Sequence, residues 1–337
     1  MSKSELGFAI VGCGRIAERH AELINSMATL KAVCDIVPVR AEQLGDKFQC
    51  NFYNSFDELL HAEKEVDIIS ICTPNGWHAA QTIDVLNAGI HVLCEKPMAI
   101  RSADCKAMML AAQENNKKLF VVKQNRYNSP VVAVKEAIEK GLLGKIFSVQ
   151  LNCFWNRDKH YYESDWKGTL QFDGGTLFTQ FSHFIDLLYW IVGDVKLVYA
   201  LTENFAHKNI IEFEDTGVVA LQFESGVLGT IHFTVNSYKK NMEGSITIFG
   251  EKGTAKIGGE YLNKLEYQCI ENYELENLPA VNSANNYGTY IGSMSNHDKV
   301  YEHVIKILLN EEDAETNAYE SMKTVEIIEK IYRAGRH

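Results

Sequence analysis

The chain has 337 residues, 46% of them hydrophobic, and a formal net charge of −11. Length and composition predict two folded domains with large cores, and the negative charge argues against nucleic-acid binding, which needs a concentrated positive face. No apolar run reaches the roughly 18 residues that a membrane helix needs, and a glycine turn comes too early in the chain for a signal peptide. We therefore expect a cytoplasmic protein with no membrane or nucleic-acid partner.

The first predicted strand, Phe8–Val11, leads into a tight turn, Gly12-Cys13-Gly14-Arg15-Ile16-Ala17. Gly12 allows the turn, and Gly14 lets the backbone approach a pyrophosphate. Ala17 replaces the third glycine of the usual pattern, where helix and strand pack closely. The turn therefore predicts a dinucleotide site.

An acidic residue supports the same interpretation. A helix beginning near Arg15 would point its first amides at the phosphates. Asp35 then follows the next apolar run, Leu30–Cys34, 21 residues after Gly14. A carboxylate there binds ribose hydroxyls and repels a 2'-phosphate, which favours NAD over NADP, although Arg40 is close in sequence.

Strands and helices alternate up to residue 122, which is typical of a doubly wound parallel sheet. We expect an NAD-binding Rossmann domain over residues 1–124. Its further elements are expected to be the helices Val39–Phe48, Ser55–Leu60, His78–Ala88 and Ser102–Asn116 and the strands Val66–Cys72, His91–Glu95 and Leu119–Val122.

From Lys145 onward, segments that alternate or carry β-branched and aromatic residues lie between turns. We expect residues 125–337 to form a substrate-binding α+β domain on an open, largely antiparallel sheet. Its exposed face predicts a homo-oligomer, a dimer or homotetramer. The strands are expected at Ile146–Trp155, Lys196–Glu203, Gly217–Phe223, Val227–Val235, Gly244–Phe249 and Gly253–Ile257, and the helices at Gly175–Trp190, Asn296–Leu309 and Tyr319–Ala334.

Ligands of an open parallel sheet bind beyond the carboxyl ends of its strands. Three polar segments follow predicted strands there: Thr73–His78, Glu95–Pro97 and Lys123–Tyr127. Lys96 lies at the depth where nicotinamide would bind, between an acidic residue and a proline that fix the local backbone. A lysine after a strand is often only a solvated end residue, so position alone leaves its role open.

A second candidate lies on the predicted helix Gly175–Trp190, where Thr179, His183 and Asp186 share one face. A helical histidine is commonly a hydrogen-bonded core residue. Oxidation of an alcohol, however, requires a group that takes the hydroxyl proton, and a histidine or a lysine can do so near neutral pH. Asp186, three residues after His183, is placed to orient its ring.

A segment between Arg157 and Lys167 mixes cationic and acidic residues with the aromatic side chains of Tyr161, Tyr162 and Trp166. Such a segment can be a solvated loop of mixed charge. It can also be a substrate loop, with stacking faces and cationic groups for an anionic ligand.

In their order along the chain, the glycine turn, Cys72–His78, Glu95-Lys96-Pro97 and Gly174–Asp186 resemble the glucose-fructose oxidoreductase and inositol dehydrogenase superfamily. The resemblance covers nearly the whole chain and implies an NAD-dependent dehydrogenase. It also implies that Lys96 and His183 meet at nicotinamide and substrate and are the catalytic residues.

A narrower resemblance concerns the UDP-N-acetylglucosaminuronate 3-dehydrogenases of bacterial surface-polysaccharide synthesis, including lipopolysaccharide and O-antigen. Those enzymes oxidise the sugar 3-hydroxyl to a ketone that an aminotransferase then uses. The chain departs from the pattern at Thr179, where many superfamily members carry aspartate, and at Lys167, where arginine is expected. The matching segments are Lys123–Asn128, Trp155–Asp158, Tyr161-Tyr162, Trp166–Thr169, Asp173–Gly175 and Thr179-Gln180.

Residues and resemblance together predict two sets of site residues. NAD is expected to be bound by Gly12, Cys13, Gly14, Arg15, Ile16, Asp35, Thr73, Pro74, Asn75, His78, Glu95, Lys96, Asn125, Trp166 and Gln180. The substrate is expected to be bound by Lys96, Asn125, Arg126, Arg157, Tyr161, Tyr162, Thr179 and His183. We expect no metal, because the eight cysteines include no Cys-x-x-Cys pair.

Two alternatives remain. One is a dehydrogenase of a free polyol or sugar such as inositol, which the cationic loop at residues 157–167 disfavours. The other is a non-catalytic regulator that senses a dinucleotide, which the presence of both Lys96 and His183 disfavours.

Overall fold

A computed structural model describes the chain except for residues 1–2, 280–282, 287–290, 311–315 and 336–337. The chain divides into two units: unit 1 comprises residues 1–122 and 297–322, and unit 2 comprises residues 123–296 and 323–337. The sequence predicts instead a division after residue 124, with both C-terminal helices in the second domain. Helix α9 (His297–Leu308) belongs to unit 1 because its apolar side chains join the core of that unit. The residues that α9 contacts are remote from it in sequence, so the hydrophobic pattern of α9 alone does not show which domain it joins.

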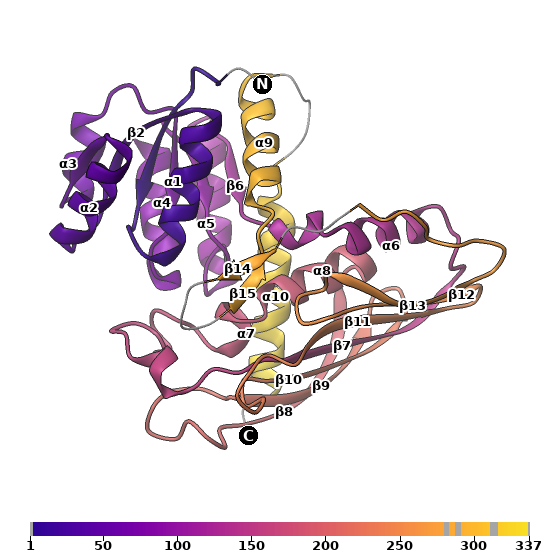
Figure 1. Cartoon of the computed structure of the whole chain (residues 1–337). Helices are drawn as coiled ribbons and strands as arrows, with labels where there is room; N and C mark the ends of the chain where they lie inside the picture. Colours follow the sequence, from indigo (N-terminus) through magenta and orange to yellow (C-terminus); the bar gives the residue numbers. More distant parts are fainter. Residues whose placement is uncertain (1–2, 280–282, 287–290, 311–315, 336–337) are drawn as a thin grey trace. The chain divides into compact units, whose positions relative to one another are not determined.

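Unit 1 contains a six-stranded parallel sheet (Figure 1). The order is that of a doubly wound sheet, so the crossover between β1 and β4 places a topological switch point at the ends of these strands. The predicted Rossmann domain is confirmed. The strands lie in the spatial order β3 (Asn51–Tyr53), β2 (Thr29–Cys34), β1 (Gly7–Val11), β4 (Ile68–Ile71), β5 (His91–Cys94) and β6 (Leu119–Val121).

Helix α1 (Arg15–Met27) buries Ala17, Ala21 and Ile24, which recur at helical spacing. Small alanines let α1 approach the sheet closely, and α9 packs beside α1 in the same core. The remaining helices of the N-terminal segment are α2 (Pro38–Phe48), α3 (Phe56–Ala62), α4 (His78–Asn87) and α5 (Ser102–Glu114).

Unit 2 contains a seven-stranded sheet in which neighbours are antiparallel except β7 and β10, which are parallel. The predicted α+β domain on a largely antiparallel sheet is therefore confirmed. Burial alternates along its central strands, so one face is covered and the other exposed. The strands lie in the order β13 (Lys264–Ile270), β12 (Gly253–Gly258), β11 (Glu243–Gly250), β7 (Ile146–Phe154), β10 (Leu228–Thr234), β9 (Thr216–Phe223) and β8 (Val195–Glu203), and a separate pair is β14 (Ala284–Asn286) with β15 (Ile291–Met294).

The covered face of this sheet carries α8 (Ser182–Val192), which lies above the strands in Figure 1. The sequence predicts one helix over Gly175–Trp190, but the structure has two, α7 (Thr176–Thr179) and α8, with a break at Phe181. Phe181 leaves helical geometry and its ring packs 5.4 Å from that of Trp155. Core packing therefore overrides helix propensity here. The other helices are α6 (Ser129–Glu139) and α10 (Ala318–Ala334), whose residues from 323 onward belong to unit 2.

Among the described residues, no helix combines the length and apolar character that a membrane crossing requires.

Candidate active-site residues

The glycine turn of unit 1 fits a dinucleotide pyrophosphate. Gly12 has a φ of +92°, and a Cβ there would lie 2.8 Å from backbone atoms at Cys72, so only glycine fits. A Cβ at Gly14 would meet nothing within 4 Å, which leaves open space over the start of α1. Helix α1 begins at Arg15 without a side-chain cap, as expected for a helix start that receives a phosphate.

Asp35 lies beside this turn at the end of β2. Its Oδ2 accepts the Cys13 N–H across 2.7 Å, and its Oδ1 accepts the Val37 N–H across 2.8 Å. A carboxylate can accept about four hydrogen bonds, so capacity remains for ribose hydroxyls. Arg40 is exposed on α2. The geometry of the turn and of Asp35 is therefore compatible with the predicted dinucleotide site.

Two loops at the carboxyl ends of β4 and β5 are joined by His78. Its Nδ1 lies 2.7 Å from the Pro97 carbonyl oxygen and its Nε2 lies 2.9 Å from that of Thr73. Asn75 is buried and Lys96 is half-buried in the same part of unit 1. The predicted residues of these loops, Thr73, Pro74, Asn75, His78, Glu95 and Lys96, are therefore brought together.

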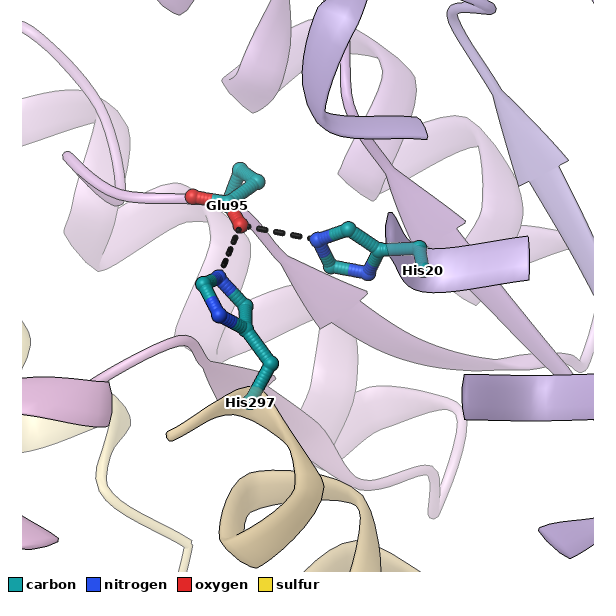
Figure 2. A group of neighbouring side chains, drawn as sticks. All are labelled: His20, Glu95 and His297. Carbon is teal, nitrogen blue, oxygen red and sulfur yellow. Dashed lines mark hydrogen bonds and ion pairs between the residues drawn. The ribbon is translucent and has the colours of Figure 1, made fainter. Parts of the chain in front are cut away.

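The sequence does not predict the partners of Glu95. Its buried carboxylate lies against His20 of α1 and His297 of α9 (Figure 2). A signal for His20 exists, because it is a polar residue on the apolar face that Ala17, Ala21 and Ile24 define. His297 has no comparable local signal, since its approach to Glu95 depends on a contact between positions about 200 residues apart.

In unit 2, the segment after residue 122 forms a buried ion cluster with α8. Lys123 Nζ lies 2.7 Å from Asp186 Oδ1, and Arg126 donates to both carboxylate oxygens across 2.8 Å. Burial alone would raise the pKa of Asp186, but these two cations hold it well below the usual range. The sequence predicts that Asp186 orients His183. In the structure, the Asp186 carboxylate instead binds Lys123 and Arg126 and accepts a hydrogen bond from Thr324 Oγ1.

His183 instead contacts Gln124, whose Nε2 lies 3.0 Å from His183 Nε2. Which group donates in this contact depends on the tautomer of His183 and on the orientation of the Gln124 amide, whose Oε1 is buried without a partner among the described residues. Gln124 Nε2 also donates to Ser293 Oγ across 3.1 Å. His183 is buried on α8. Asn125, which follows Gln124 in the sequence, is also buried, and neither atom of its side-chain amide has a hydrogen-bond partner among the described residues. Such an orphaned amide suits a bound ligand.

The loop at residues 157–167 is tied to the α7–α8 break by Gln180. Gln180 Oε1 accepts from Arg157 Nε across 2.7 Å, and its Nε2 donates to Tyr161 Oη across 2.7 Å. The Arg157 guanidinium also lies over the Tyr161 ring, and Lys167 Nζ lies 3.5 Å from the centre of that ring. The predicted substrate loop is thus an ordered aromatic and cationic cluster.

The other predicted residues of this region lie around the cluster. Tyr162 is buried against Tyr161 in an edge-to-face arrangement, and Trp166 is half-buried. Thr179, where many superfamily members carry aspartate, donates its hydroxyl to Asp173. Arg157 is only 3% exposed, and its guanidinium donates to the Asn156 carbonyl and to Asn241 Oδ1 as well as to Gln180.

Residues 6–123 match a family model described as an oxidoreductase family with an NAD-binding Rossmann fold, and residues 131–256 match the GFO/IDH/MocA C-terminal domain. The WlbA dehydrogenase from Bordetella pertussis, solved with NADH and UDP-GlcNAcA, is 36% identical, with a TM-score of 0.87 over 99% of this chain and 97% of that one. The WlbA dehydrogenase from Chromobacterium violaceum, solved with the same ligands, is also 36% identical, with a TM-score of 0.88 over 100% and 95%. Inositol 2-dehydrogenase of Salmonella typhimurium is 29% identical over 262 residues, which are 74% of this chain and 72% of that protein.

Proposed function

Because the chain belongs to the GFO/IDH/MocA family of NAD-dependent sugar oxidoreductases, we propose that it oxidises the 3-hydroxyl of a UDP-linked N-acetylglucosaminuronic acid to a ketone. The product would serve an aminotransferase in the synthesis of a bacterial surface polysaccharide. Transamination needs a carbonyl group, which the ketone at C3 would supply.

The reaction removes a hydride from C3 of the sugar and a proton from its O3. The nicotinamide of bound NAD supplies the hydride acceptor. Lys96 or His183 takes the hydroxyl proton, and the Lys96 ammonium can also stabilise the negative charge that develops on O3. His183 suits the role of base, because a neutral imidazole can take a proton from a hydroxyl group.

The Gln180 bridge is the observation that carries the choice of an anionic nucleotide sugar. It ties Arg157 and Tyr161 to the segment that leads into His183, and Lys167 adds a second cation on the Tyr161 ring. Aromatic faces and cations beside a candidate base suit a ligand with a uracil ring, phosphates and a carboxylate. A neutral polyol needs none of these groups.

The second candidate, oxidation of a free polyol, is favoured by the 29% identity to inositol 2-dehydrogenase. The third, a regulator that only senses NAD, would need neither Lys96 nor His183. Both residues are present in this chain. Lys96 follows the carboxyl end of β5, where ligands bind in this fold, and His183 lies on α8.

A ligand series distinguishes these candidates. Melting of the purified protein is measured with NADH and, in turn, UDP-GlcNAcA, UDP-GlcNAc and myo-inositol, and NADH formation from NAD is then followed with each sugar. We expect stabilisation and turnover with UDP-GlcNAcA, and a much weaker response to UDP-GlcNAc, which lacks only the carboxylate. Turnover of inositol alone contradicts the proposal, and binding of NAD without turnover of any of the three supports a regulator.

A further inference from the structure

The backbone that carries Lys96 is held on both sides by side chains of unit 1. The Lys96 N–H donates to Glu95 Oε2 across 3.0 Å. On the other side of Lys96, His78 Nδ1 lies 2.7 Å from the Pro97 carbonyl oxygen. The Glu95 amide itself donates to the Ile71 carbonyl of β4, so the start of the loop is anchored to the sheet.

The second oxygen of the Glu95 carboxylate ends a buried chain of polar groups. His20 Nε2 lies 2.8 Å from Glu95 Oε1, and His20 Nδ1 lies 2.7 Å from Tyr301 Oη. Tyr301 Oη lies 3.0 Å from Ser70 Oγ. One assignment satisfies every contact: Ser70 donates to Tyr301, Tyr301 to His20, and His20 to Glu95. Donors aligned in one direction polarise one another toward the carboxylate.

His297 completes the surroundings of this carboxylate. Its Nε2 lies 3.5 Å from Glu95 Oε1, too far for a good hydrogen bond, and within the described residues neither ring nitrogen has a hydrogen-bond partner. Burial lowers the pKa of His297, so its ring is neutral. Burial alone would raise the pKa of Glu95, but the hydrogen bond with His20 is the largest opposing contribution and the pKa lies well below the usual range, so Glu95 remains an anion.

Two imidazoles and a carboxylate also suggest a metal site, since one nitrogen or oxygen of each lies within 4.8 Å of the others. The distances favour hydrogen bonding. Tetrahedral zinc holds its ligand atoms at about 2.0–2.2 Å and so about 3.4 Å from one another, whereas His20 Nε2 and Glu95 Oε1 are 2.8 Å apart. The Nε2 proton that donates to Glu95 also occupies the lone pair that a metal would need.

We propose that Glu95 is a positioning residue for Lys96, and that His20 fixes the Glu95 carboxylate in the orientation that binds the Lys96 amide. This inference rests on the proposed function, in which Lys96 contacts the reacting hydroxyl. A displacement of a reacting group by about 1 Å can cost a hundredfold in rate, so control of the Lys96 backbone has a kinetic consequence. Unlike a metal or a proton relay, this arrangement needs no additional group.

Amide hydrogen exchange tests the anchoring without any substrate. Exchange measured residue by residue by NMR follows the Lys96 amide directly, and the neighbouring Pro97 contributes no amide. Glu95→Gln keeps the size of the side chain but offers one carbonyl oxygen to two donors. We expect the Lys96 amide to exchange at least about tenfold faster in Glu95→Gln, on the scale of one lost hydrogen bond. Unchanged exchange at Lys96 overturns the proposal.

Single-turnover hydride transfer tests the consequence. We expect Glu95→Gln to slow transfer at saturating NAD by about 10- to 100-fold, the usual effect of losing a supporting contact. His20→Leu should also slow transfer, whereas His20→Gln, whose amide nitrogen can replace Nε2 as a donor, should retain most of the rate. This pair keeps the test valid if Glu95→Gln does not fold. Equal rates in the two His20 variants contradict the proposal.

A double-mutant cycle separates this inference from the proposed function. If Glu95 acts through Lys96, Glu95→Gln should have little further effect in a Lys96→Met background. A full effect in that background, or stoichiometric metal in the purified holoenzyme, overturns the positioning role. No rate loss in Lys96→Met alone instead overturns the proposed role of Lys96. The control is Asn317→Ala, which removes two contacts to the Val121 backbone and should lower only the melting temperature.

Discussion

Asp35 has two tasks at the residue scale. It closes the glycine turn by accepting the amides of Cys13 and Val37, and we propose that its remaining acceptor sites bind the ribose hydroxyls. A 2'-phosphate in the same place would face a carboxylate that is only 9% exposed, with little solvent to screen the repulsion.

We therefore expect NAD to bind at least about tenfold more tightly than NADP, which corresponds to roughly 1.4 kcal/mol. Asp35→Ala should weaken both cofactors, because the turn loses two supports, but it should weaken NAD more and so narrow the gap. Calorimetric titration of both cofactors measures this, with Asp46→Ala on the exposed side of α2 as the control. Equal affinities of the wild-type protein for NAD and NADP would contradict the proposed role of Asp35.

The sequence predicts residues with a local signature and misses those whose partners are remote. Gly12, Gly14 and Asp35 lie within one strand–turn–helix–strand unit, so spacing alone identifies them. His20 contacts a tyrosine 281 positions away, and Gln124 reaches His183 across 59 positions. A single sequence contains no signal for such pairings, because they depend on how whole elements pack.

Among the strands, those buried in the middle of the sheet have a clear local sequence signal, whereas edge strands do not. The sequence predicts β7 and β10 nearly to the residue, because β-branched and aromatic residues alternate along them. It does not predict β13, whose mixture of charged and polar residues is typical of an edge strand. The break between α7 and α8 is also missed, because it results from the packing of Phe181 rather than from a glycine or a proline.

The start of α7 in unit 2 depends on a buried acid, Glu214. Tyr332 of α10 donates to Glu214 Oε1 across 2.7 Å, and the Leu177 amide of α7 donates to Tyr332 Oη across 2.9 Å. Burial raises the pKa of Glu214 to about 8, above the usual value near 4.5, and the hydrogen bond from Tyr332 only partly offsets this effect. The folded state therefore retains a proton that the unfolded chain releases.

Such a group stabilises the fold fully below pH 4.5, and this contribution is lost as the pH rises to about 8. We expect Glu214→Gln, which is neutral at every pH, to match wild type near pH 5 and to exceed its free energy of unfolding at pH 8 by on the order of 3 kcal/mol. Chemical denaturation followed by circular dichroism at both pH values measures the difference. Glu224→Gln, at an exposed position, is the control and should show no such crossover. A Glu214 variant that is less stable than wild type at pH 8 contradicts the assignment.

In the whole molecule, the exposed face of the seven-stranded sheet carries several large apolar side chains. Tyr199 and Leu201 of β8 are 72% and 69% exposed, and Val218 pairs with Leu201 on the neighbouring strand β9. Contiguous apolar side chains on a monomer surface commonly mark an interface. The alternation of burial along these strands makes this face predictable from the sequence.

We expect this face to join copies of the chain into a dimer or tetramer. Leu201→Lys should reduce the assembly, because it places a charge in the middle of the apolar surface. Light scattering after size-exclusion chromatography measures the mass, and Leu110→Lys, at an exposed position on α5, is the matched control. A monomeric wild-type protein at micromolar concentration would contradict the expectation.

The proposed reaction depends most on Lys96 and His183, which belong to different units and whose catalytic roles we propose from resemblance and from the local geometry of each residue. The most direct test is single-turnover hydride transfer from UDP-GlcNAcA to NAD, measured by NADH fluorescence in Lys96→Met and His183→Asn. We expect each change to slow transfer by about a hundredfold or more, the scale of one acid–base or oxyanion contact, while NAD affinity is retained. Near wild-type rates in both variants would contradict a catalytic role for Lys96 and His183.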